Sequence, residues 1–124
     1  MALNKVMLIG KCGGDPEIRE VNGSKVASIS VATTERFRDK SGETKEQTEW
    51  HRVIVRKHIA EFAENNVHKG SQVFVEGKIK TRKWTDTKGV ERYSTEIHAE
   101  NLQILGRKSQ DDNNKRGIEY NDSF

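Results

Sequence analysis

Long stretches in which apolar and polar side chains alternate, broken by one segment of helical spacing, most constrain the fold of this chain. The alternating stretches are residues 25–37, 48–56, 71–84 and 92–105. Side chains point alternately to the two faces of a strand, so the pattern predicts half-buried strands. Residues 57–68 instead show helical periodicity and end at Lys69-Gly70, which predicts one helix between two of these strands.

A short apolar run, Val6 to Ile9, enters a glycine-rich bend and predicts a first strand ahead of these four. Residues 17–21 are expected to continue extended before a turn at Asn22-Gly23. Five strands with one helix between the third and fourth follow the order of an oligonucleotide-binding (OB) barrel. We therefore expect an all-β domain with one short helix, a five-stranded OB-fold barrel, over residues 1–105.

Three further segments complete the predicted layout. Residues 38–47 are charged and contain Ser41-Gly42, so an exposed flexible loop is expected there. The alternation changes phase near Glu100-Asn101, which suggests a β-bulge in the last strand. From Gly106 the pattern ends, and residues 106–124 are predicted to form a disordered linker and an acidic tail ending in Phe.

The chain has 124 residues, enough for one domain with a modest core, and a net charge of +3. Residues 1–105 hold 18 Lys+Arg against 15 Asp+Glu, and the remainder holds four of each. The net charge therefore belongs to the folded part. Cys12 is the only cysteine, so an intrachain disulfide is not possible, and neither a membrane span nor a signal peptide is evident. We expect a soluble, intracellular protein.

Two strands combine an indole with a row of cations on one face. Residues Lys78, Lys80, Arg82 and Trp84 share one side of their strand, and Trp50, Arg52 and Arg56 share one side of another. Aromatic platforms beside positive charge suit a flexible polyanion with flat bases. A solvated strand face explains either strand alone, but the two together favour a single track for single-stranded nucleic acid.

Other aromatic residues are less decisive. Phe37, between Arg36 and Arg38, fits either a third stacking residue or a hydrophobic plug at a strand end. Tyr93 lies on the apolar phase of the last strand, which predicts core packing.

Enzymatic patterns are not evident. The four histidines are scattered and only one cysteine accompanies them, so zinc-ligand spacing is missing. The glycines of residues 10–14 precede neither Gly-Lys-Ser/Thr nor a helix, unlike a phosphate-binding loop. We expect no enzymatic activity, no metal and no cofactor.

Several motifs together resemble the bacterial single-stranded DNA-binding protein family, SSB. They are Asn4-Lys5-Val6, Gly10, Gly14 to Glu17, Lys45 to Arg52, Lys69 to Val73 and Thr81 to Asp86. The resemblance implies an OB fold that assembles as a homotetramer wrapped by single-stranded DNA. It also implies base stacking by Trp50, Trp84 and Phe37, which resolves the role of Phe37 toward DNA, and a subunit interface at His51.

Basic residues near the implied DNA path complete the predicted site. Phosphate and base contacts are predicted for Lys5, Arg52, Arg56, Lys57, Lys69, Lys78, Lys80, Arg82 and Lys83. Arg56 departs from the family, whose best-known members have a stacking aromatic there; a guanidinium can still stack and pair with phosphate. Binding is therefore expected to persist with more salt dependence at this position.

The C-terminal tip also departs from the family pattern. It reads Glu119, Tyr120, Asn121, Asp122, Ser123 and Phe124, where members usually have a longer linker and a more acidic tip ending in Pro-Phe. Docking of this tip on replication and repair proteins is expected, in a weakened or altered form, although a vestigial tail fits as well. The sequence thus predicts coating of single-stranded DNA in replication, recombination and repair. An OB-fold RNA-binding factor and an adaptor of a replication or conjugation complex are the alternatives.

Overall fold

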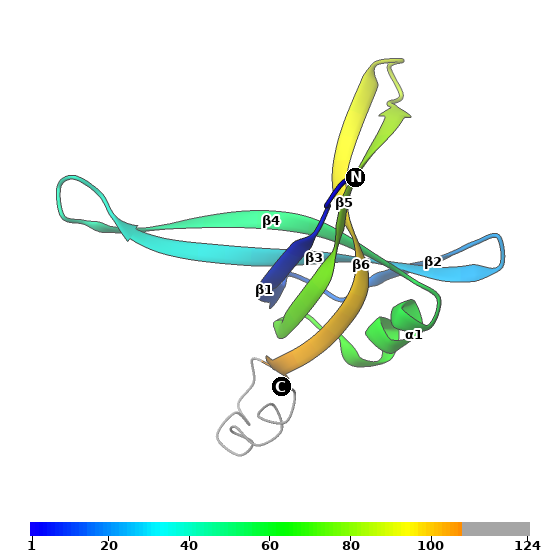
Figure 1. Cartoon of the computed structure of the whole chain (residues 1–124), viewed down its shortest axis with the longest axis horizontal. Coiled ribbons are helices and arrows are strands. Elements are labelled where there is room, and N and C mark those ends of the chain that lie inside the picture. Colours follow the sequence, from blue (N-terminus) through cyan, green and yellow to red (C-terminus); the bar gives the residue numbers. More distant parts are fainter. Residues whose placement is uncertain (108–124) are drawn as a thin grey trace.

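The computed structural model describes residues 1–107, which form six strands and one helix (Figure 1). In chain order these are β1 (Val6–Cys12), β2 (Glu17–Val21), β3 (Ser24–Arg38), β4 (Thr44–Arg56), α1 (Lys57–Asn66), β5 (Ser71–Thr85) and β6 (Glu91–Arg107). The strands pair in the order β1-β5-β6-β4-β3-β2, and a further pairing of β1 with β3 closes the sheet. Five strands thus form a closed barrel with a helix between β4 and β5, which confirms the predicted OB fold.

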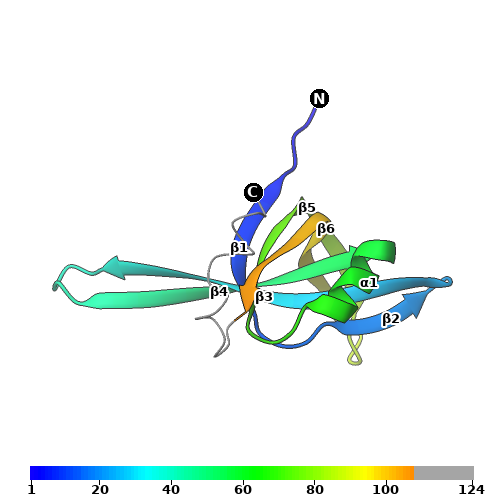
Figure 2. The same cartoon turned by 90° about the horizontal axis from the view of Figure 1, so that it is seen from below.

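The barrel interior is built from the apolar phase of the alternating strands. The fully buried side chains include Ile29, Val31, Val53, Val55, Val73 and Val75. Helix α1 packs against β3, β4 and β6 (Figure 2), and it buries Ala60 and Ala63. The helix ends two residues before the predicted boundary, where the Val67 N–H donates to the Ala63 carbonyl at 2.9 Å and the chain becomes extended.

The predicted exposed loop over 38–47 is shorter than expected, because strand occupies residue 38 and residues 44–47 and leaves only residues 39–43 as the connection. Strands β3 and β4 pair out to Arg38 and Thr44 and form a long arm (Figure 1). The remaining turn is closed by Asp39, whose Oδ1 accepts hydrogen bonds from the Ser41 and Glu43 backbone N–H groups. A high density of charge did not distinguish strand from loop here, because both faces of an extended hairpin are solvated.

Strands β5 and β6 form a second arm beyond the barrel (Figure 1). Ile79 is 46% exposed and Tyr93 66% exposed, so the predicted core packing of Tyr93 is wrong. Glu76 pairs with Asn101 and Gly77 with Ala99, so Glu100 is an extra residue in β6. This bulge confirms the one predicted from the phase change near Glu100-Asn101.

Strand β2 confirms the extended segment predicted for residues 17–21 before a turn at Asn22-Gly23, although the count of five strands did not include it. Its residues pair antiparallel with the first half of β3, from Glu17 opposite Ser28 to Val21 opposite Ser24. Strands β2 and β3 therefore form a hairpin, which lies at the side of the barrel where α1 lies (Figure 2). Strand β6 continues to Arg107, and the predicted linker and tail from residue 108 onward lie outside the described residues.

Candidate nucleic-acid interface

The two predicted Trp–cation faces are one continuous surface, which we call the outer face. It comprises Trp50 and Arg52 on β4, Lys78, Lys80, Arg82 and Trp84 on β5, and Glu96 on β6. Strand β6 lies between β4 and β5 in the sheet. The two arginines meet there, because Arg52 Nε and Arg82 Nη2 each lie 3.3 Å from Oε2 of Glu96.

The indole of Trp50 is largely exposed, and the glycine beside it leaves room for the ring. The residue is 61% exposed and lies opposite Ala32 of β3. Its benzo edge approaches the backbone of Gly13, where an added Cβ would lie 2.6 Å from Cζ3 of the indole. The Gly13 N–H donates to the Ser30 carbonyl at 3.0 Å, which holds the bend in place.

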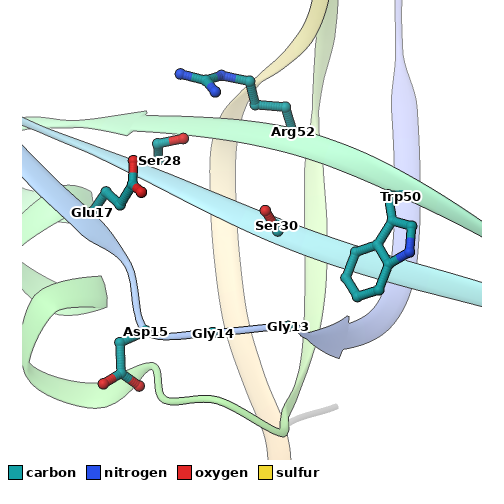
Figure 3. Close-up of a pocket in the computed structure, with 8 residues that line it drawn as sticks. All are labelled: Gly13, Gly14, Asp15, Glu17, Ser28, Ser30, Trp50 and Arg52. Atoms are coloured by element: carbon teal, nitrogen blue, oxygen red, sulfur yellow. The ribbon is translucent and has the colours of Figure 1, made fainter.

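A hollow of about 340 Å³ lies beside Trp50 (Figure 3). Gly13 and Ser30 line it near the indole, and Arg52 lines it on the β4 side. Asp15 and Glu17 also line this hollow, and the carboxylate of Glu17 points toward Ser28. Its walls thus include both a cation that could contact phosphate and acceptors that could receive base N–H groups.

We predict that Gly13→Ala displaces the Trp50 ring. The new methyl group would overlap the indole, and the ring would have to rotate because the backbone bend is held by its hydrogen bond. The expected result is a changed Trp emission spectrum and weaker binding of oligo-dT. Gly14→Ala is the matched control, because a Cβ there meets nothing within 4 Å. Identical emission and binding of the two variants would contradict the prediction.

On the second strand, Trp84 lies within the β5–β6 arm and is 41% exposed. It is directly opposite Arg92, whose Nε lies 3.1 Å from Oδ2 of Asp86. Lys83 alternates with Trp84 and lies opposite Tyr93, on the other face of the arm. The β5–β6 register therefore separates Lys83 from the outer face, whereas Lys80 and Arg82 share a face with Trp84.

Glu96 sets the electrostatics at the centre of the outer face. Its side chain is 4% exposed, and its Oε1 lies 3.2 Å from Nε2 of His98. Burial alone raises the pKa of the Glu96 carboxyl. Hydrogen bonds with His98 and Arg82, and the charges of Arg82 and Arg52, outweigh burial and hold that pKa below its ordinary value. Glu96 is therefore ionised at neutral pH.

The other predicted contact residues lie away from this centre. Phe37 is 45% exposed and lies opposite Lys45 near the end of the β3–β4 arm. Exposed Arg56 and Lys57 mark the junction of β4 and α1. The structure thus places Phe37 on a different arm from Trp84 (Figure 1).

Two of the lysines predicted to contact DNA, Lys5 and Lys69, interact with acidic side chains of the chain itself. Lys5 forms an ion pair with Glu76. The hydrogen bond within this pair raises the pKa of Lys5. Lys69 follows α1, and its backbone N–H donates to Asp15 Oδ1 at 2.9 Å. The residue is exposed, and this hydrogen bond joins its backbone to Asp15 in the glycine-rich bend.

His51, predicted at a subunit interface, points away from the outer face. It alternates with Trp50 along β4, and its Nε2 lies 2.9 Å from Thr33 Oγ1. The imidazole is half-buried within the single chain.

Sequence reasoning missed Glu96, Gly13 and Arg92. Glu96 is one of many acids in a charged chain, and its burial depends on arginines from two other strands. A glycine in a bend does not reveal which side chain approaches it. Arg92 could have been found from the sequence, since a hairpin that turns at Lys88-Gly89 places it opposite Trp84.

Residues 1–107 offer neither a metal-binding cluster nor a membrane-spanning helix. No cluster of three or more His, Cys, Asp or Glu side chains in that range could hold a metal ion. Within the same range, no helix has the length and apolar character needed to cross a membrane.

The barrel and its outer face define an OB-fold protein with an exposed aromatic and cationic surface. Residues 3–105 match the model of the single-strand binding protein family. A solved structure described as Plasmodium falciparum SSB complex with ssDNA is 39% identical, with a TM-score of 0.77. The match covers 85% of this chain and 96% of that chain. The chain belongs to the single-strand binding protein family.

Proposed function

We propose that this protein binds single-stranded DNA without sequence preference through its outer face. The observation that carries the proposal is the convergence of Arg52 and Arg82 on Glu96, which joins two exposed indoles into one cationic surface. Membership of the family supports it, as does a structural neighbour described in complex with single-stranded DNA.

The proposed mechanism combines base stacking with phosphate contacts. Each base stacked on Trp50 or Trp84 contributes about 1–3 kcal/mol and does so for any base, because all have a flat face. Arg52, Lys80 and Arg82 neutralise phosphates and release counterions, so affinity falls as salt rises. Neither step breaks a covalent bond, and we propose a binding protein and not an enzyme.

Competition between nucleic acids tests this function. A labelled dT oligomer bound to the full chain is challenged with unlabelled oligo-dT, mixed-sequence DNA, poly-U and duplex DNA. The proposal predicts strong competition by both single-stranded DNAs and weak competition by duplex. Stronger competition by poly-U would favour an RNA-binding factor, and failure to bind oligo-dT would favour an adaptor.

We further propose that the chain acts as a homotetramer with His51 at a subunit interface, as the family resemblance implies. The DNA-binding unit, predicted as residues 1–105, would extend to Arg107 because β6 ends there, and the residues that follow would form a linker and tail. Sedimentation with and without a dT oligomer of several tens of bases gives the oligomeric state and stoichiometry. A monomer in both conditions would contradict the assembly.

The biological setting we propose is coating of DNA during replication, recombination and repair in the bacterial cytoplasm, at the nucleoid. Recruitment of replication and repair proteins would use residues 119–124. Deleting Phe124 is expected to reduce capture of those proteins on DNA-bound protein, because the tip would lose its apolar aromatic side chain. Unchanged capture would indicate a vestigial tail.

A further inference from the structure

Glu96 is the charged residue that the described part of the chain buries most completely, and three potential cations contact it. Its Oε2 accepts hydrogen bonds from Nε and Nη2 of Arg82, both at 3.3 Å. The same oxygen lies 3.3 Å from Arg52 Nε, and Oε1 lies 3.2 Å from His98 Nε2. Lys80 is directly opposite Glu96 across the β5–β6 ladder.

A carboxylate at the centre of a phosphate-binding surface has two opposing effects. Its charge repels phosphate, so electrostatics alone predicts tighter DNA binding when it is removed. Its hydrogen bonds, however, restrain two long side chains that otherwise lose rotamer freedom when they bind a ligand. The buried position of Glu96 favours the second effect, since burial strengthens its contacts with both guanidiniums and limits their movement.

The guanidiniums retain capacity for a ligand while they contact Glu96. Each guanidinium has five N–H donors in a planar fork, more than one shared carboxylate oxygen can accept. The side chains of Arg52 and Arg82 are 45% and 52% exposed, against 4% for Glu96. Each arginine thus has one edge on the buried carboxylate and part of its surface in solvent, where phosphate would approach.

We propose that Glu96 is a positioning residue for single-stranded DNA, which it affects through Arg52 and Arg82. It fixes the two guanidiniums between the Trp50 and Trp84 platforms, so that phosphates meet preorganised donors while neighbouring bases stack. This role rests on the proposed function. Preorganisation raises affinity by reducing the ordering that binding would otherwise require.

The test compares Glu96→Gln with Glu100→Gln in the full chain. Both variants remove one negative charge from β6, but Glu100 is 67% exposed and lies 3.9 Å from Lys78. Affinity for labelled oligo-dT is measured by anisotropy at several salt concentrations. Glu96→Gln is expected to weaken binding about tenfold despite the more positive net charge, whereas Glu100→Gln keeps or slightly raises affinity. Equal or tighter binding by Glu96→Gln would overturn the proposal.

A double-mutant cycle separates positioning from general structural support. If Glu96 acts through Arg82, Glu96→Gln should cost clearly less affinity in an Arg82→Gln background than in the wild type. The same fold loss in both backgrounds would contradict positioning. Thermal unfolding confirms that the variants are folded.

Glu96→Asp decides the matter if Glu96→Gln does not fold, because it keeps the charge but withdraws the carboxylate from the guanidiniums. It should also weaken binding, and wild-type affinity would overturn the proposal. Failure of the wild type to bind oligo-dT would instead refute the proposed function, which makes the two failures distinguishable.

Discussion

Trp84→Ala is expected to weaken binding of oligo-dT by about 1–3 kcal/mol, or about 5- to 150-fold, because one base loses its stacking platform. The cost in folding free energy should be small, about 0.5 kcal/mol or less, since the residue lies on an arm outside the core. Anisotropy of a labelled oligomer measures affinity, and thermal unfolding measures stability.

Phe62→Ala is the matched control for this substitution. Phe62 on α1 is 41% exposed, the same fraction as Trp84, but it belongs to a helix that contributes no residue to the outer face. Its loss should leave oligo-dT affinity within about twofold of the wild type. If Trp84→Ala lowers stability more than affinity, or if both variants lose affinity equally, then Trp84 is not a base platform.

Gly77→Ala is expected to destabilise the fold by about 1–3 kcal/mol or more. A Cβ at this position would lie 2.2 Å from the His98 carbonyl oxygen and 2.7 Å from Ala99 Cα. Both neighbours belong to backbone, which cannot rotate away, and the site is at the bulge where the β5–β6 arm leaves the barrel.

Urea unfolding measures this effect, with Gly14→Ala as the control. Gly14 has nothing within 4 Å of an added Cβ, so that variant should stay within about 0.5 kcal/mol of the wild type. Equal unfolding midpoints for the two variants would show that β5 and β6 can separate at the bulge without cost.

The alternation of side chains predicted the barrel well because it reports a local property of each strand. The buried positions Val53, Val55, Val73 and Val75 follow it directly. The same alternation failed at Tyr93, because periodicity says which face a side chain joins but not whether another element covers that face. The β5–β6 arm extends beyond the barrel, so Tyr93 remains exposed there.

The outer face was only partly accessible to sequence reasoning. Trp50 and Arg52 could be assigned to one side of β4, and Arg82 and Trp84 to one side of β5, from period two alone. That the two sides are continuous depends on β6 lying between those strands, a pairing between distant parts of the chain. The contacts of Glu96 with Arg52 and Arg82 exist only because of that pairing. The sequence therefore does not distinguish Glu96 from the solvated acids.

The proposed function depends most on the stacking of Trp50 and Trp84 on the bases of single-stranded DNA. Intrinsic Trp fluorescence of the full chain, titrated with a dT oligomer of several tens of bases at moderate salt, tests it most directly. Because both indoles lie on the outer face, strong saturable quenching is predicted, with a partial loss of quenching in Trp84→Ala. Negligible quenching at saturating DNA would show that Trp50 and Trp84 do not stack on the bases.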